Sequence, residues 1–196
     1  LNALTSINVC EENEMYASID GVLYSKDLTT IIRYPEGRNE VTYHIPKHVE
    51  KIGEQAFRGA LYLEQVAFDE DSRLIEIGDQ SFEDAVSLLS IDIPDSVERI
   101  GWGAFYNAKS LESITFGESS LLKRIENSTF SDAISLTSIE IPSSVEYIGE
   151  VAFIRASALI AINVAEGNQV YRTIDGILYS KDVSTLIIYP EGKLNS

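Results

Sequence analysis

Two histidines offer the first candidate chemistry in the chain, because imidazole nitrogens are common metal ligands. His44 and His48 lie four residues apart, a spacing that would bring the two rings together on a helix. Pro46 lies between them and favours an extended turn, since the residue before a proline avoids helical dihedral angles. The sequence adds no third ligand to this pair, so we predict that it binds no metal.

The run Asp69-Glu70-Asp71 offers carboxylate oxygens, which are the ligands that calcium prefers. It lacks the spaced oxygen ligands and the glycine of a dedicated calcium loop, so we predict no calcium site. The lone cysteine, Cys10, excludes an internal disulfide. Its counterpart in a second copy of the same segment is Ala165, and we therefore expect Cys10 to be a small buried apolar side chain rather than a nucleophile.

Catalytic motifs do not appear elsewhere in the sequence. It contains no G-x-S-x-G, no H-E-x-x-H and no phosphate-binding glycine loop. The many carboxylates form no evident catalytic pair. We predict a protein that is not an enzyme and that binds no cofactor. Asn127 begins an N-glycosylation sequon, Asn127-Ser128-Thr129, which is either a chance match or an acceptor in an exported eukaryotic protein.

The elements that position these side chains come from an internal repeat, marked by a phenylalanine that returns every 25 or 23 residues. The five positions are Phe57, Phe82, Phe105, Phe130 and Phe153. Each unit follows the pattern [VL]-x-x-I-[GE]-x-x-[AST]-F-x-x-A-x-x-L-x-x-[VI]-x-[IFV], and a repeat of this length is typical of a solenoid. We expect the phenylalanine rings to stack along its core, and the closing residues to form a strand with alternate side chains inward.

Glycines follow the repeated isoleucine in four of the five units, at Gly53, Gly78, Gly101 and Gly149, and Glu126 replaces the glycine in the other unit. We expect these glycines to turn a corner with positive φ angles. Pro46, Pro94 and Pro142 directly follow a strand, where a missing amide donor ends the pairing.

A second kind of unit occurs twice, at residues 3–37 and 158–192, with 22 identical residues in 35. Asp20-Gly21 and Asp175-Gly176 predict tight hairpin turns, so we interpret each copy as a three-stranded β meander, at about 11–37 and 166–192. The tyrosines of these meanders either form a stacking platform or pack a small sheet. They are Tyr16, Tyr24, Tyr34, Tyr171, Tyr179 and Tyr189. Because the copies lie 155 residues apart, we expect the chain to be part of a longer array with that period.

Composition limits the partners of the chain. Its 31 acidic and 15 basic residues give a net charge of −16, which repels phosphate backbones and anionic membrane surfaces. No apolar stretch approaches the length of a membrane helix. We therefore predict no nucleic-acid partner and no membrane insertion, and the dispersed charge is consistent with a role in solubility.

The outward residues of the closing strands form the candidate interaction face. Stacked strands lie about 4.8 Å apart, so these residues should form a ribbon of small polar groups that could bind a protein. The alternative is a solvated sheet face without a partner. The candidate residues are Gln65, Ser90, Asp92, Ser113, Thr115, Ser138, Glu140 and Asn163.

The segments IPDSVERIGWGAFYNAKSLESITF and IPSSVEYIGEVAFIRASALIAINV resemble the BspA-type leucine-rich repeat, and the meander DGVLYSKDLTTIIRYPEG resembles an element that often interrupts arrays of that family. The resemblance implies a right-handed curved solenoid of the kind found in surface proteins of host-associated bacteria and some protozoa. Roles in adhesion to matrix proteins or other cells are described for these proteins. The resemblance supplies no functional residues, because the motif is structural.

Taken together, these features predict a strand-dominated α/β leucine-rich-repeat solenoid with two three-stranded meanders. We expect one solenoid fragment over residues 1–196, with five repeats at about 45–164. The expected function is a non-enzymatic protein-protein interaction or adhesion module of a larger cell-surface or secreted protein, whose ligand is a protein such as a host matrix protein or a partner cell surface. The alternatives are an accessory segment of a secreted multidomain enzyme and a purely architectural spacer.

Overall fold

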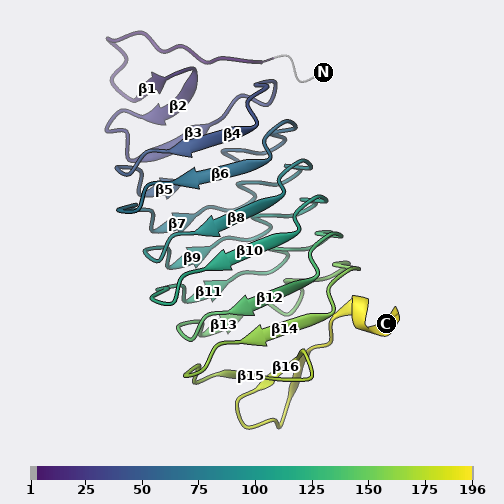
Figure 1. Ribbon diagram of the computed structural model, residues 1–196. Helices are drawn as coiled ribbons and strands as arrows, with labels where there is room; N and C mark the ends of the chain where they lie inside the picture. Colours follow the sequence, from purple (N-terminus) through teal and green to yellow (C-terminus); the bar gives the residue numbers. More distant parts are fainter. Residues whose placement is uncertain (1–3, 196) are drawn as a thin grey trace.

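A computed structural model describes residues 4–195 and shows a stack of flattened turns with strands on two opposite sides (Figure 1). The front layer consists of parallel strands of four residues, one from each turn, in a four-stranded sheet (β10-β8-β6-β4) and a two-stranded sheet (β12-β14). These strands are β4 (Thr42–Ile45), β6 (Gln65–Phe68), β8 (Ser90–Ile93), β10 (Ser113–Phe116), β12 (Ser138–Ile141) and β14 (Ala161–Val164).

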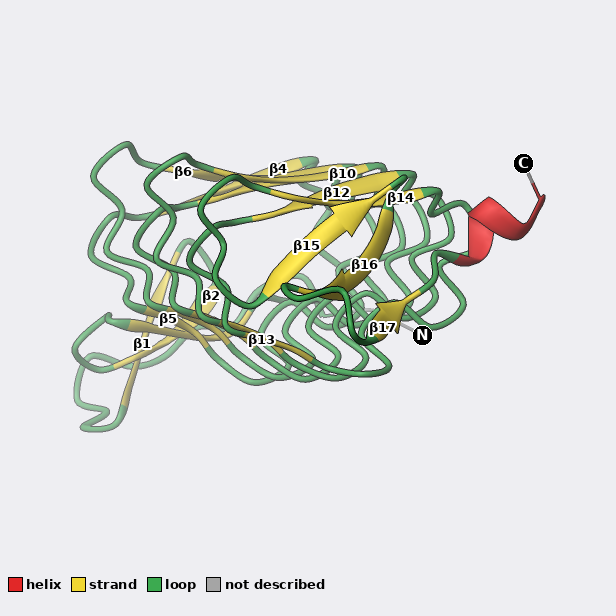
Figure 2. Cartoon of the chain, turned by 90° about the horizontal axis from the view of Figure 1, so that it is seen from below, coloured by secondary structure: helices red, strands yellow, loops and turns green. Residues whose placement is uncertain are grey.

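The back layer is an eight-stranded sheet in the order β1-β2-β3-β5-β7-β9-β11-β13 (Figure 2). Its two-residue parallel strands are β5 (Lys51–Ile52), β7 (Glu76–Ile77), β9 (Arg99–Ile100), β11 (Arg124–Ile125) and β13 (Tyr147–Ile148). Its antiparallel strands are β1 (Tyr16–Ile19), β2 (Val22–Ser25) and β3 (Thr30–Arg33). The described chain closes with β15 (Tyr171–Ile174), β16 (Ile177–Ser180), β17 (Leu186–Ile188) and the 3₁₀ helix η1 (Glu191–Asn195).

Stacked phenylalanine rings fill the core between the two layers, as the repeat predicts. Phe82, Phe105 and Phe130 are fully buried, and the centroids of neighbouring rings lie 5.3 and 5.5 Å apart. The stack continues through Phe57 to Tyr34 of the first meander, at a centroid distance of 5.0 Å. One aromatic column therefore runs through the repeats and joins them to the first meander.

The helical part of the expected α/β class is wrong, because η1 is the only helix within residues 4–195 and it is a 3₁₀ helix. The segment around each phenylalanine is a series of turns in which backbone amides bond to the neighbouring unit. The Phe82 amide, for example, donates to the Ala104 carbonyl at 2.7 Å. Residues with positive φ interrupt the segment, such as Gln80 at 53° and Asp84 at 58°. These left-handed residues and the bonds between turns are incompatible with a continuous helix.

The four corner glycines do not have the positive φ angles that we expected, and that explanation is wrong. Close approach between neighbouring turns constrains these glycines instead. A Cβ atom on Gly53 would lie 2.7 Å from the Ile31 carbonyl oxygen, and one on Gly78 would lie 2.7 Å from that of Ile52. Glycine lets one turn lie directly against the backbone of the previous one.

Both meanders contain three antiparallel strands, but only the second forms a separate sheet. In the first meander, β3 pairs in parallel with β5, so the meander continues into the back layer. The predicted hairpin turns are confirmed, with φ of 48° and 78° at Asp20 and Gly21 and closely similar angles at Asp175 and Gly176. Tyr24 and Tyr34 are buried, so these two pack the core rather than form an exposed platform, whereas Tyr16 is exposed.

Cys10 is exposed, so the prediction of a buried side chain is wrong. Its counterpart Ala165 lies beside β12 and donates its amide to the Ile141 carbonyl at 2.9 Å. The segment that carries Cys10 lies at the end of the stack (Figure 1), where no such turn lies beside it within the described residues. Ala165 is half-buried and Cys10 is exposed, so the neighbouring turn reduces the exposure of this position.

Candidate interaction face

The eight candidate residues lie on the front layer, and we call this set the strand face. Seven of them are exposed and Ser90 is half-buried. Parallel, in-register pairing brings equivalent positions together, so Gln65 and Ser113 flank Ser90, Asp92 pairs with Thr115, and Glu140 pairs with Asn163. The alternate residues of the same strands, such as Ile91 and Ile139, are buried. The sequence period of two thus places polar groups outward and aliphatic groups in the core.

Two carboxylates give the strand face its charge. Asp92 accepts a hydrogen bond from the Thr115 hydroxyl, and neither Asp92 nor Glu140 has a Lys or Arg partner within residues 4–195. The outward positions of β4 to β14 contain no Lys or Arg at all, and their one other titratable side chain is the exposed His44. This face is therefore acidic and lacks its own counter-charges.

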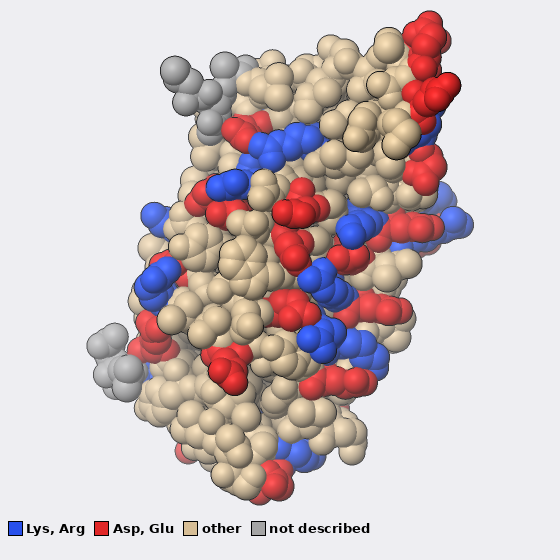
Figure 3. All heavy atoms as spheres, turned by 180° about the vertical axis from the view of Figure 1, so that it is seen from behind, with Lys and Arg blue, Asp and Glu red and all other residues tan. Residues whose placement is uncertain are grey.

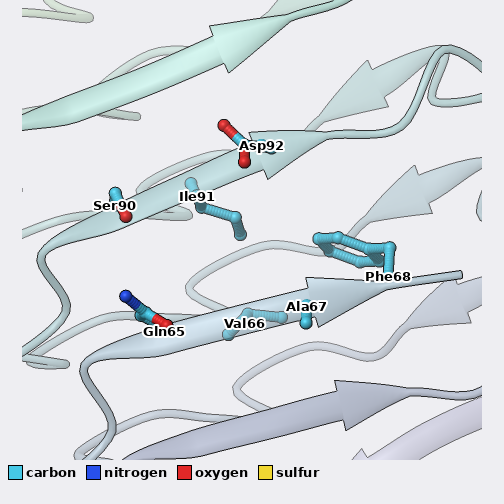
Figure 4. A pocket seen from close by; sticks show the side chains of 7 residues that line it. All are labelled: Gln65, Val66, Ala67, Phe68, Ser90, Ile91 and Asp92. Atoms are coloured by element: carbon cyan, nitrogen blue, oxygen red, sulfur yellow. The ribbon is translucent and has the colours of Figure 1, made fainter.

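Shallow hollows lie between the strands of this face. One of about 300 Å³ is lined by Gln65, Ser90 and Asp92, with Phe68 at its end (Figure 4). A second, of about 390 Å³, is lined by Thr115, Phe116 and Glu140, among others.

A third hollow, of about 670 Å³, lies at the carboxyl ends of the strands. The half-buried rings of Phe68 and Phe116 line it together with the exposed carboxylates of Glu70, Asp92 and Asp95. Five of the eight candidate residues line at least one of these hollows, and they are Gln65, Ser90, Asp92, Thr115 and Glu140. The other three, Ser113, Ser138 and Asn163, line none of the three hollows.

On the back of the molecule, Lys and Arg side chains lie among Asp and Glu side chains (Figure 3), and those of the back layer pair with one another. Arg99 on β9 lies 2.6 Å from carboxylate oxygens of both Glu76 and Asp79. Glu76 also lies 3.0 Å from the Lys51 ammonium group, and Arg124 stacks over the Tyr147 ring at 4.2 Å. These interactions form a ladder across adjacent strands, so the charges of the back layer already have partners within the chain.

Two carboxylates of the acidic run considered for calcium binding make contacts within the protein. Lys47 donates its amide to Asp69 at 3.2 Å and its ammonium group to Asp71 at 3.0 Å. The hydrogen bond from Lys47 lowers the pKa of Asp71. His44 lies on β4 and His48 in the turn that follows it. Residues 4–195 contain no group of three His, Cys, Asp or Glu side chains arranged to hold a metal ion.

Comparison with known proteins agrees with this geometry. The model of the BspA type leucine-rich repeat region matches residues 37–160 and 75–186, with six copies of the repeat. The chain belongs to the BspA type leucine-rich repeat family. No curated protein sequence matches it.

Three solved structures that resemble this BspA type repeat chain are bacterial proteins. The pneumococcal vaccine antigen PcpA is 28% identical with a TM-score of 0.77, over 92% of this chain and 46% of PcpA. A leucine-rich repeat protein from Eubacterium ventriosum is 24% identical with a TM-score of 0.67, over 86% and 51% of the two chains. The T. pallidum leucine-rich repeat protein is 25% identical with a TM-score of 0.64, over 80% and 71%. The chain spans about half the length of the first two.

The sequence reasoning missed the ion-pair ladder of the back layer, although a signal for it exists. The residue before the repeated isoleucine is Lys51, Glu76, Arg99, Arg124 and Tyr147 in successive units. In-register parallel pairing stacks these residues, so their charges can be compared directly along the column.

No helix within residues 4–195 of this BspA type chain has the length and hydropathy needed to cross a membrane.

Proposed function

We propose that this BspA type repeat chain is a non-enzymatic protein-binding module that holds a basic segment of a partner protein on its strand face. The observation that carries the proposal is the contrast between the two layers. The back layer pairs its charges internally, whereas Asp92 and Glu140 on the front lack a cationic partner within the described residues. An acidic face complements a basic ligand and increases the rate of encounter with it.

The hollows support a specific mode of binding for lysine or arginine side chains. Phe68 and Phe116 offer apolar surface for the methylene stem, and Asp92, Asp95 and Glu140 offer oxygens for the cationic head. Each such exposed contact contributes about 0.2–1 kcal/mol, so a single face should bind weakly. Affinity would rise when several copies of the module engage one partner at the same time.

The larger setting of this module is a cell-surface or secreted protein, with a host matrix protein or a partner cell as the ligand. The similarity to PcpA, which is described as a pneumococcal vaccine antigen, supports this setting. The family match supports a repeat module for protein interaction.

Three substitutions test the proposed face. The variant Asp92→Arg, Thr115→Arg and Glu140→Arg reverses the charge of the strand face without changing a buried side chain. We expect it to lose binding to a surface coated with a lysine-rich peptide and to immobilised matrix proteins, while its circular dichroism spectrum and melting temperature stay close to those of the parent. Attachment equal to that of the parent would refute the proposal.

A matched control separates the face from net charge. The variant Asp92→Asn with Glu140→Gln removes two negative charges from the strand face, and Glu12→Gln with Glu14→Gln removes two from an exposed segment outside it. Binding should weaken about 2-fold to 30-fold in the first variant, from the loss of two exposed charge contacts of about 0.2–1 kcal/mol each, and remain unchanged in the second. Equal weakening in both would assign the attraction to the overall charge of −16 instead.

A further inference from the structure

A hollow between the front layer and the second meander has the opposite charge to the strand face. It has a volume of about 320 Å³ and lies where the end of β14 meets β15. The exposed cations Arg172 and Lys181 line it, together with Tyr171, Thr173 and the exposed carboxylate of Glu166. We call it the basic hollow, because two cationic side chains and one carboxylate line it.

The two cations of the basic hollow have donors without an acceptor in the described part of the chain. Six of the eight arginines form an ion pair with a carboxylate, whereas Arg73 and Arg172 form none within residues 4–195. Lys181 donates one hydrogen bond, to the Asn168 carbonyl at 2.5 Å, and an ammonium group has three donors. Glu166 pairs with neither cation, so the basic hollow can donate several charged hydrogen bonds to an anion.

The charge of this region distinguishes the second meander from the first. Three positions here differ in charge between the two copies, and each difference makes the second copy more positive. The three pairs are Glu12 and Gly167, Glu14 and Gln169, and Ala17 and Arg172. The one other difference in charge, Arg33 against Ile188, lies on the third strand of the meander. The basic hollow is therefore a property of the second copy and not of the meander in general.

The basic hollow lies inside the stack and not at its end. It lies between the second meander and the turn before it, because β15 packs beside β14 and β17 lies on the far side of β16. A turn that follows a meander leaves this region open. Lys26, the counterpart of Lys181, is exposed although β5 of the following turn pairs with β3 of the first meander.

The basic hollow meets the strand face at Ala165. This residue lines both the basic hollow and the hollow of about 390 Å³ that contains Glu140. Glu140 pairs with Asn163 on β14, two residues before Ala165. Along this edge of the front layer the charge therefore changes from acidic at Glu140 to basic at Arg172.

We propose that the basic hollow binds a carboxylate of the partner protein and so fixes the direction in which the basic segment lies on the strand face. This inference rests on the proposed function, because the same partner must occupy both hollows. Arg172 would donate two parallel N–H bonds to the carboxylate, and Lys181 would add a second positive charge. Because the two hollows share Ala165, the acidic residue of the partner should lie close in sequence to the lysine or arginine beside Glu140.

Three peptides test the site by isothermal titration calorimetry. One contains lysines only, and the other two carry three glutamates either before or after the same lysines. Attraction to the net charge of −16 alone predicts that both glutamate peptides bind more weakly than the lysine peptide. The proposal predicts that one of the two orders binds at least about 2-fold more tightly than the lysine peptide, from two exposed charge contacts, and that the other order does not.

Two variants locate the effect. Arg172→Ala with Lys181→Gln should remove the tighter binding of the glutamate peptide without weakening that of the lysine peptide. Lys26→Gln with Lys109→Gln removes two exposed cations outside the basic hollow and should preserve the tighter binding.

The proposal is overturned if the parent binds both glutamate peptides more weakly than the lysine peptide, or if the tighter binding survives in the Arg172→Ala, Lys181→Gln variant. Either result leaves the strand face as the site of the lysine peptide. A parent chain that does not bind the lysine peptide would instead refute the proposed function together with this inference.

Discussion

Truncation of the central phenylalanine, Phe105→Ala, should destabilise the whole stack. The ring is fully buried, and truncation of a buried phenylalanine typically costs about 3–5 kcal/mol. Phe105 stacks between Phe82 and Phe130, with centroid distances of 5.3 and 5.5 Å and interplanar angles of 1° and 4°. Each aromatic pair contributes about 0.5–1.5 kcal/mol beyond burial, so we expect a loss in the upper half of that range.

The assay is urea unfolding followed by circular dichroism, with Phe105→Leu and Phe153→Ala as comparisons. Phe105→Leu keeps most of the buried apolar surface and loses the stacking, so its loss should be smaller, about 1–3 kcal/mol. Phe153 stacks on one phenylalanine, Phe130, and its truncation should cost less than that of Phe105. A loss below about 1 kcal/mol for Phe105→Ala would refute the stacked core.

Three further predictions concern the turns and the back layer. Hydrogen bonds from Ser180 and Ser184 lower the pKa of Asp182 from 3.8 to about 2. The contribution of the Asp182 carboxylate to stability is therefore present above about pH 4 and is lost as the pH falls through 2. An NMR titration of Asp182 should show this midpoint, and the Asp182→Asn variant should lose this pH dependence of stability. Arg99→Ala should lower the free energy of unfolding by no more than about 1 kcal/mol in low salt, because the Arg99 side chain is 34% exposed. The loss should be smaller still in 1 M NaCl, which screens the ion pairs. A larger loss in thermal melts that persists in salt would point to packing instead. Gly78→Ala should lower the free energy of unfolding in urea titrations by about 1–3 kcal/mol, because the new Cβ atom would lie 2.7 Å from the Ile52 carbonyl oxygen. An unchanged free energy of unfolding would show that the turns can move apart.

The repeat predicts the strands and the core because both depend on residue type at a fixed spacing. The stacked phenylalanines and the polar outward positions of β8 and β12 follow from columns in the sequence. The same columns did not reveal the conformation of the segments between the strands. Those segments could have been helical by length, but their amides bond to the next turn and residues such as Asp84 adopt left-handed angles.

Features that depend on the neighbouring turn were the hardest to predict. Cys10 and Ala165 occupy equivalent positions, yet Cys10 is exposed because no described turn lies beside it. The corner glycines have ordinary φ angles and are constrained by the backbone of the previous turn, which a single repeat does not reveal. The hollows of the front layer likewise depend on how side chains from adjacent strands meet, so the sequence gives their residues without their shape.

The central claim, that the strand face is the binding surface, is tested most directly by backbone NMR of the chain titrated with a lysine-rich peptide. We predict that chemical-shift changes concentrate on β8, β10 and β12, around Asp92, Thr115 and Glu140. The Asp92→Asn, Glu140→Gln variant should need about 2-fold to 30-fold more peptide for the same changes. Changes centred instead on the back layer around Arg124, or on the exposed meander tyrosine Tyr16, would contradict the account and place the binding surface elsewhere.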